Sequence, residues 1–228
     1  MDHSEVVADE LRAAPNETPE RRAQRIDAWI ASRVPDLRFL LANLLDGGRS
    51  PVAIAGNGVG AVGHSFGGWA VLETAVLEKR ISSIVALAPA GGAHRRTGML
   101  PVTATLNLQR AVAVLYVAAE LDASIPLDSI EDLFDRTPGC KRLVVIPKAD
   151  HLHFVDQAET SHEAVRAMNF PKDLAWLRQA MRPFGELLPE AEAHRRVRGY
   201  ALAHLDATLK AMREAVAFWN TVEGRSGP

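Results

Sequence analysis

The chain has 228 residues, of which 47% are hydrophobic and 24% charged, and these proportions predict a single globular domain spanning residues 1–228. Its formal net charge of −2 argues against a nucleic-acid partner, because nucleic-acid-binding proteins carry a basic surface. The single cysteine, Cys140, excludes an internal disulfide, and no spacing of cysteines and histidines indicates a metal ion or another cofactor.

The N-terminal residues contain neither the basic start nor the apolar core of a signal peptide. No later stretch reaches the roughly 18 consecutive apolar residues that a membrane-spanning helix needs. We therefore expect a cytoplasmic protein that has no membrane partner.

A first long helix is predicted over residues 21–45, where apolar residues recur at intervals of three and four. Pro35 interrupts this pattern, so we expect the helix to be kinked or split there. Gly47 and Gly48 are expected to end the helix, because glycine readily takes the left-handed conformation of a helix cap. Residues 50–58 then form a loop that leads into the next element.

A short apolar run, a glycine-flanked serine and a second apolar run occupy residues 58–72. Gly63, Ser65 and Gly67 fit the pattern G-x-S-x-G, in which small residues let a strand and a helix approach while the serine occupies a strained turn. Such a nucleophile elbow would hold the Ser65 hydroxyl exposed. The amide of Phe66, at the N-terminus of the helix, would point toward an oxyanion forming on a substrate.

Strands and helices alternate after this turn, which is the pattern of an α/β fold. Continuous apolar runs over residues 81–89, 112–119 and 142–147 predict buried parallel strands, and residues 129–134 predict a short helix. The expected architecture is a parallel sheet with helices on its faces. Ligands of such sheets bind beyond the carboxyl ends of the strands.

Polar residues fall at these carboxyl ends. Asp122 follows the run 112–119 and His151 follows the run 142–147, so both are expected at the same sheet edge as Ser65. A serine hydroxyl needs an imidazole to take its proton, and the imidazole needs a carboxylate to orient it. We therefore predict Ser65 as the nucleophile, His151 as the base and Asp122 as the orienting carboxylate, in the chain order Ser, Asp, His.

Neighbouring residues are alternatives for two of these roles. Glu120 and Asp128 are the alternative carboxylates. His153 is the alternative base, although His151 lies closer to the end of the strand.

Other polar residues near the motifs are expected to be structural. Asp150 is expected to be a solvated turn residue. His64 is expected to pack or hydrogen bond beneath the elbow, because its side chain cannot easily reach the Ser65 hydroxyl. Four further histidines lack spaced partners and are expected to be surface or core residues: His94, His162, His194 and His204.

Two helical segments complete the chain. Residues 155–192 carry apolar side chains at roughly helical spacing, and we expect either a helical lid-like insertion over an apolar acyl pocket or a helical pair that covers the sheet. Residues 193–218 predict a final amphipathic helix that packs on the sheet.

Four stretches of the chain together resemble a known superfamily: residues 60–68 around the serine, residues 86–89, residues 120–126 and residues 150–154. In these stretches the chain is similar to the α/β-hydrolase superfamily, and within it to dienelactone-hydrolase-like and acetylhydrolase-like esterases. Residues 33–40 also resemble the helix that precedes the elbow strand in those enzymes.

This resemblance implies a serine hydrolase that cleaves a small to medium, apolar carboxylic ester through an acyl-enzyme, without a cofactor. It implies that Ser65, Asp122 and His151 occupy the triad positions of the family.

The chain departs from the family ahead of Ser65. Only 64 residues precede the serine and most of residues 21–45 is predicted to be helical, so the strands that precede the elbow in the family are not expected here. The loop that donates a second amide to the oxyanion hole in the family is missing with them. Either the chain is a truncated form, or another segment completes the oxyanion hole and covers the edge of the elbow strand.

This departure leaves alternatives to hydrolysis open. A relative with an incomplete oxyanion hole would be non-catalytic or weakly catalytic and would serve as a binding or assembly subunit. An acyltransferase or cyclase would use the same triad and would differ only in what attacks the acyl-enzyme. Because the unpaired edge of the elbow strand invites association, we expect a homodimer or a higher assembly in which residues 1–20, a second copy or another polypeptide shields that edge.

Overall fold

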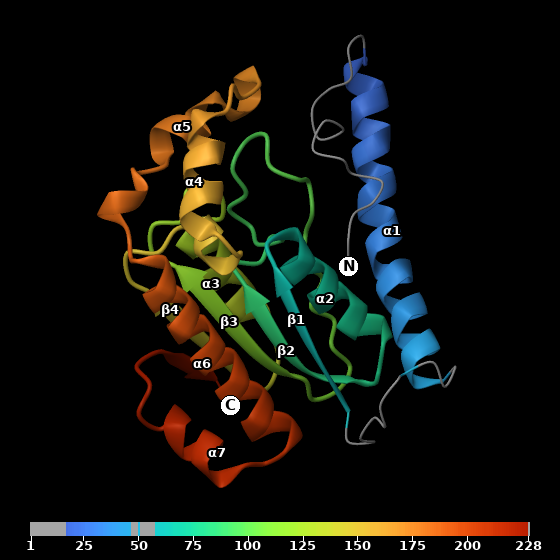
Figure 1. The fold of residues 1–228 in the computed structure, drawn as a ribbon. Coiled ribbons are helices and arrows are strands. Elements are labelled where there is room, and N and C mark those ends of the chain that lie inside the picture. The colour runs from blue at the N-terminus through green and yellow to red at the C-terminus, as the bar shows by residue number, and fades with distance from the viewer. Residues whose placement is uncertain (1–16, 47–49, 51–57, 228) are drawn as a thin grey trace.

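The computed structural model describes residues 17–46, 50 and 58–227. Figure 1 shows a central twisted sheet with helices on both of its faces. The strands are β1 (Val59–His64), β2 (Ile81–Leu87), β3 (Ala113–Ala119), β4 (Lys141–Ile146) and β5 (Arg225–Gly227). The α-helices are α1 (Pro19–Leu45), α2 (Phe66–Leu77), α3 (Leu127–Arg136), α4 (Ala158–Ala167), α5 (Ala175–Ala180), α6 (Glu190–Leu209) and α7 (Arg213–Trp219). Short 3-10 helices are η1 (His151–Phe154), η2 (Lys172–Leu174) and η3 (Phe184–Glu186).

The described sheet has the strand order β1-β2-β3-β4-β5, and β1 to β4 are parallel, as predicted. β5 runs antiparallel to β4, with Arg225 opposite Leu143, so the sheet is mixed rather than wholly parallel. The three residues of β5 show no apolar pattern that predicts a strand. Their pairing with β4 arises from the course of the chain after α7.

Both faces of the sheet are covered at β2 and β3, which explains the continuous apolar runs of these two strands. Ile84 and Ala86 of β2 face one core, which includes side chains of α1, α2 and α3. Val85 and Leu87 of the same strand face a second core, which includes side chains of α6 and α7. Because successive side chains of a strand point to opposite faces, one short run supplies both cores.

α1 is one helix that runs through Pro35, so the prediction of a split is wrong. It begins at Pro19, where the Thr18 side chain caps it by accepting a hydrogen bond from the Arg21 amide at 3.3 Å. Leu37, beyond the proline, packs against the core that α2 covers. Packing of this kind offsets the backbone hydrogen bond that Pro35 cannot make.

The predicted final helix over residues 193–218 is also wrong, because the chain forms two helices there. Between them Ala211 takes a left-handed conformation with a φ of 51°. The Met212 amide donates to the Asp206 carbonyl at 3.1 Å and closes the turn before α7 begins. This reversal brings Trp219 into the core that α6 covers.

β1 lies at one edge of the described sheet, and β2 is its one partner among the described strands. Residues 1–16, which belong to the segment expected to shield this edge, lie outside the described residues, as do Gly47 and Gly48. None of the helices within residues 17–46 and 58–227 has the length and apolar character needed to span a membrane.

Candidate active site

Ser65 forms the sharp turn between β1 and α2. Its backbone has a φ of 56° and a ψ of −120°, a conformation that L-residues adopt only where surrounding contacts hold it. The Ser65 amide donates to the Leu87 carbonyl at 2.9 Å, and the Ala90 amide donates to the Ser65 carbonyl at 3.0 Å. These bonds fix the turn to the carboxyl end of β2.

Glycines on both sides of Ser65 let the strand and the helix approach. A Cβ on Gly63 would overlap the carbonyl group of Gly67, so only glycine fits there. A Cβ on Gly68 would lie 2.8 Å from the Cβ of Pro89, whereas a Cβ on Gly67 would meet nothing within 4 Å. The close approach therefore requires glycine at positions 63 and 68. At Gly67, the last glycine of the G-x-S-x-G pattern, a side chain would meet no neighbouring atom.

A series of hydrogen bonds joins three of the predicted site residues. Ser65 Oγ lies 2.9 Å from His151 Nε2, and His151 Nδ1 lies 2.7 Å from Asp122 Oδ2. Asp122 Oδ1 accepts hydrogen bonds from the amides of Ser124 at 2.8 Å and Ile125 at 2.7 Å. An ionised carboxylate beside Nδ1 keeps the ring proton on that nitrogen, so Nε2 is left to accept the serine hydroxyl.

Burial and the neighbouring carboxylates act in opposite directions on the pKa of His151. The Asp122 side chain is wholly buried and the His151 side chain is 12% exposed. Burial lowers the pKa of His151, but the charge and hydrogen bond of Asp122, together with the charge of Asp150, outweigh it and raise this pKa above its ordinary value. The arrangement thus places a basic imidazole against a serine hydroxyl.

His153, the alternative base, makes other contacts with both of its ring nitrogens. It is fully buried, its Nδ1 accepts a hydrogen bond from the Asp150 amide at 2.9 Å, and its Nε2 donates to the Leu188 carbonyl at 2.8 Å. These two bonds anchor the backbone around η1 and leave neither ring nitrogen for Ser65.

Neither of the alternative orienting carboxylates, Glu120 and Asp128, contacts His151 through a hydrogen bond. Glu120 accepts a hydrogen bond from the Lys148 amide at 2.8 Å, and Asp128 is exposed in the first turn of α3. Among the described carboxylates, Asp122 is the one that is hydrogen bonded to His151.

Asp150 is buried, so the prediction that it is a solvated turn residue is wrong. Its side chain accepts a hydrogen bond from the His153 amide in a capping box. Its Oδ1 lies 3.4 Å from Nδ1 of His162, which comes from α4 and is fully buried as well. A tertiary partner 12 residues along the chain, and not the local turn sequence, therefore decides the environment of Asp150.

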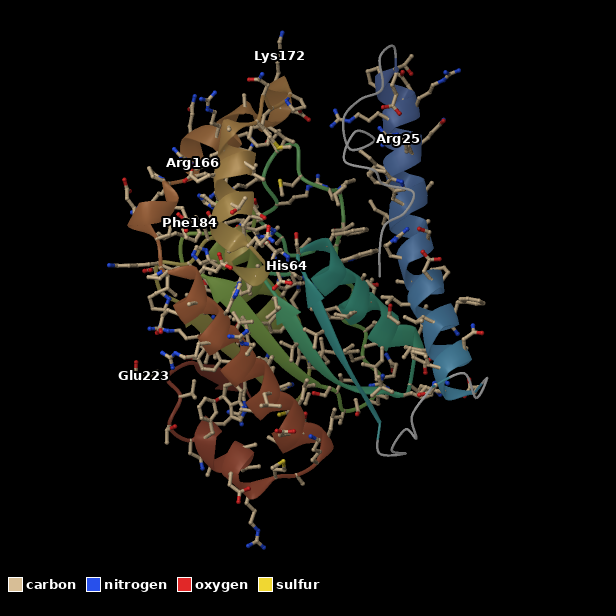
Figure 2. All side chains as sticks on the ribbon, viewed as in Figure 1. Arg25, His64, Arg166, Lys172, Phe184 and Glu223 are labelled. Carbon is tan, nitrogen blue, oxygen red and sulfur yellow. The ribbon has the colours of Figure 1, made fainter. Side chains whose placement is uncertain are left out.

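His64 packs beside His151. Figure 2 labels it near the carboxyl end of β1, and its ring centroid lies 4.5 Å from that of His151 and 5.4 Å from that of Phe154. Burial, followed by repulsion from His151, lowers the pKa of His64 to about 3. The ring is therefore a neutral packing surface for His151 at ordinary pH.

A pocket opens beside Ser65. Its lining includes Phe66, Arg95, Arg96 and Met99. The last three belong to the loop between β2 and β3, in which the sequence motifs predict no functional residue. A signal was present, since paired glycines and paired arginines follow the carboxyl end of a predicted strand.

Residues 155–192 contain α4, η2, α5, η3 and the first residues of α6, and Figure 1 shows α4 and α5 beyond the carboxyl ends of the strands. Among the described residues that line the pocket, none comes from this segment. Trp176 of α5 instead reaches the pocket loop, where its Nε1 donates to the Thr97 carbonyl at 3.0 Å. The segment thus supports the loop that lines the pocket.

Phe66 is the first residue of α2 and lines the same pocket as Ser65. Amides at a helix N-terminus favour negative charge, which is the property that an oxyanion hole needs. Within residues 17–46, 50 and 58–227, no three histidine, cysteine, aspartate or glutamate side chains are arranged to hold a metal ion.

No protein-family profile and no curated protein sequence matches the chain. A solved ferulic acid esterase from Streptomyces cinnamoneus is similar in structure, with 20% identity and a TM-score of 0.56 over 88% of this chain. A predicted CIB-like hydrolase from Thermoplasma acidophilum matches with 17% identity and a TM-score of 0.41, over 60% of this chain and 57% of that one. Est1E from Butyrivibrio proteoclasticus matches with 18% identity and a TM-score of 0.37, over 55% of this chain and 63% of that one.

The chain spans 56% of the length of the Streptomyces esterase that it matches. The elbow turn, the strand order and this likeness of the backbone agree with one another. The chain therefore has the α/β-hydrolase fold.

Proposed function

We propose that this protein is a serine esterase that cleaves a small to medium carboxylic ester through an acyl-enzyme. The observation that carries the proposal is the unbroken series of hydrogen bonds from Ser65 Oγ through His151 to Asp122. The likeness of its fold to a ferulic acid esterase supports the same class of reaction.

The proposed acylation step begins with attack of Ser65 Oγ on the ester carbonyl carbon, while the hydroxyl proton passes to His151 Nε2. The electron pair of the carbonyl π bond moves onto oxygen and forms an oxyanion. When the carbon–oxygen bond to the alcohol breaks, His151 returns the proton to the departing alcohol oxygen. Asp122 remains ionised throughout and stabilises the transient imidazolium.

Deacylation repeats these transfers with water. His151 Nε2 takes a proton from the water as its oxygen attacks the acyl-enzyme, and then returns that proton to Ser65 Oγ as the carboxylic acid leaves. The Phe66 amide is proposed as one donor to both oxyanions. Because loss of one such donor costs about 10²- to 10³-fold in turnover, a hole with a single amide would still give a slow esterase.

The alternative function is a binding or assembly subunit that keeps the elbow as a structural turn. The position of β1 at the edge of the described sheet favours it, because an exposed strand edge is suited to association. Acyl transfer or cyclisation by the same triad is a further alternative, and product analysis would separate it from hydrolysis.

A fluorophosphonate probe tests the proposal. It should label the wild type at Ser65, and Ser65→Ala should abolish labelling and reduce hydrolysis of a nitrophenyl ester by about 10⁴- to 10⁶-fold. Ser161→Ala, which removes a hydroxyl from α4, is the matched control and should behave as the wild type. Turnover that is the same in the wild type and in Ser65→Ala would favour the binding subunit.

A further inference from the structure

The charged side chains that line the pocket beside Ser65 are all basic. Arg95 and Arg96 line it, and no aspartate or glutamate is among the described residues that line it. The chain as a whole carries a formal net charge of −2, so this concentration of positive charge is local. A partly enclosed pocket lined by charges of one sign raises the local concentration of oppositely charged ligands.

Asp132, a carboxylate that contacts this loop, is paired with an arginine of its own helix. Asp132 of α3 accepts a hydrogen bond from the Ala93 amide at 3.0 Å and forms an ion pair with Arg136 at 2.8 Å. The pKa of Asp132 lies below its ordinary value, chiefly because of the Arg136 hydrogen bond. No described side chain forms an ion pair or a hydrogen bond with the guanidinium of Arg95 or Arg96. Both guanidinium groups therefore keep their capacity to bind an anion.

Arg96 is held in place by an aromatic ring. Its guanidinium carbon lies 5.3 Å from the ring centroid of Trp176. The Trp176 Nε1 donates to the carbonyls of Thr97 and Asp173, each at 3.0 Å, so the indole is itself fixed. Stacking over an aromatic face leaves the N–H groups at the edge of the guanidinium available for a bidentate carboxylate contact.

We infer that this pocket binds an ester bearing a second, ionised carboxylic acid group, and that Arg95 and Arg96 bind that carboxylate while Ser65 faces the scissile ester. The inference rests on the proposed esterase function and adds the charge of the substrate to it. The apolar residues of the same lining, such as Met99 and Ile125, would contact the carbon chain between the two groups.

A matched pair of esters tests this inference. The monoanionic nitrophenyl ester of adipic acid and its neutral methyl ester have nearly the same shape and differ in one charge. The wild type should hydrolyse the anionic ester with a kcat/KM at least about tenfold higher, as expected for one charge-assisted hydrogen bond. Raising the salt concentration from about 0.05 M to about 0.5 M should lower the ratio of the two kcat/KM values, because both arginines are exposed and dissolved ions screen their charges.

Single and double substitutions assign the preference to the arginines. The ratio of kcat/KM for the anionic ester to kcat/KM for the neutral ester should fall in Arg95→Gln and in Arg96→Gln, and should approach one in the double variant. Arg178→Gln, which removes an exposed arginine of α5 outside the pocket lining, is the control and should keep the preference. A wild type that does not prefer the anionic ester, or a preference that survives in the double variant, would overturn the inference.

Binding to Ser65→Ala separates this inference from the esterase function. In titration calorimetry hexanoate should bind more tightly than hexanamide, and adding Arg95→Gln and Arg96→Gln should remove the difference. Arginine-dependent hexanoate binding by a protein that cleaves no ester would contradict the proposed function and leave the anion site standing. Hydrolysis of both esters at equal rates, without arginine-dependent binding, would contradict the anion site and leave the function standing.

Discussion

Three side chains at the carboxyl ends of separate strands meet because the backbone around each of them is fixed independently. The positive φ of Ser65 directs its hydroxyl toward His151, and the amides of Ser124 and Ile125 hold the Asp122 carboxylate. His151 then needs only to lie between two fixed groups. At the residue scale, the carboxylate also sets the basicity of the imidazole, which makes the proposed mechanism dependent on pH.

The first prediction concerns the acidic side of the pH profile. Only neutral His151 can take the proton of Ser65, so kcat/KM for a nitrophenyl ester should rise as the pH increases through the pKa of His151, which lies above 6.5. Asp122→Asn removes the charge that raises this pKa, so the acidic limb should move to lower pH and turnover should fall by about 10⁴-fold. Profiles from about pH 5 to about pH 9 measure both effects.

Asp128→Asn is the control for this experiment, because Asp128 is exposed on α3 and should leave the profile unchanged. An acidic limb at the same pH in Asp122→Asn and in the wild type would show that Asp122 does not set the pKa of His151.

At the scale of elements, a buried contact joins the loop of His151 to α4. His162 Nε2 donates to the Arg182 carbonyl at 2.8 Å, and its Nδ1 faces the Asp150 carboxylate at 3.4 Å. With a proton on each nitrogen the ring both satisfies the carbonyl and neutralises the buried charge of Asp150. Burial lowers the pKa of His162, but the interaction with the Asp150 carboxylate and the hydrogen bond to the Arg182 carbonyl outweigh burial and raise this pKa.

The second prediction is that His162→Gln destabilises the fold by about 1–3 kcal/mol at mildly acidic pH, because Asp150 loses its buried cationic partner. A raised pKa in the folded state means that the stabilisation is fully present below the ordinary value of 6.5 and is lost as the pH rises through the raised value. The difference in the free energy of unfolding between wild type and variant should therefore shrink as the pH increases. Urea unfolding at a series of pH values measures it.

His94→Gln, a substitution at an exposed histidine, is the control and should have little effect on stability at any pH. A difference between wild type and His162→Gln that stays constant or grows with pH would mean that His162 is neutral in the folded protein.

At the scale of the whole molecule, one edge of the described sheet is formed by β1, whose outer side has no partner among the described strands. β1 pairs with β2 alone among the described strands, and Val62 is 51% exposed. Val62 and the half-exposed Leu40 of α1 line one apolar groove along this edge. An exposed strand edge beside apolar side chains favours association.

We therefore propose a homodimer or higher assembly in which a second copy of the chain covers the β1 edge. Light scattering coupled to size exclusion at about 10 µM should give a mass above the 24.8 kDa of one chain. Val62→Lys should shift the protein toward the monomer, because a charged side chain at a strand edge opposes pairing with another strand. Lys172→Gln, at an exposed lysine of η2 outside the lining of this groove, should keep the wild-type mass, and a wild-type monomer would contradict the proposal.

The sequence by itself determined the elements whose signals are local. Gly63 and Ser65 predict a strand-to-helix turn because the steric limits on the turn come from residues within a few positions. The apolar runs of β2, β3 and β4 predict buried strands because both faces of the sheet are covered. The order of polar residues after those strands was sufficient to select Ser65, Asp122 and His151 as one candidate site.

The tertiary structure alone decided the contacts between segments distant in sequence. Asp150 is buried because α4 returns His162 to it, and β5 is a strand because α7 brings three residues without an apolar pattern beside β4. Arg96 lines the pocket beside Ser65 with Trp176 stacked against it, although 79 residues separate Thr97 from the indole that binds its carbonyl. Local patterns specify turns and periodicity, whereas the burial of a charge and the lining of a pocket depend on which distant segments pack together.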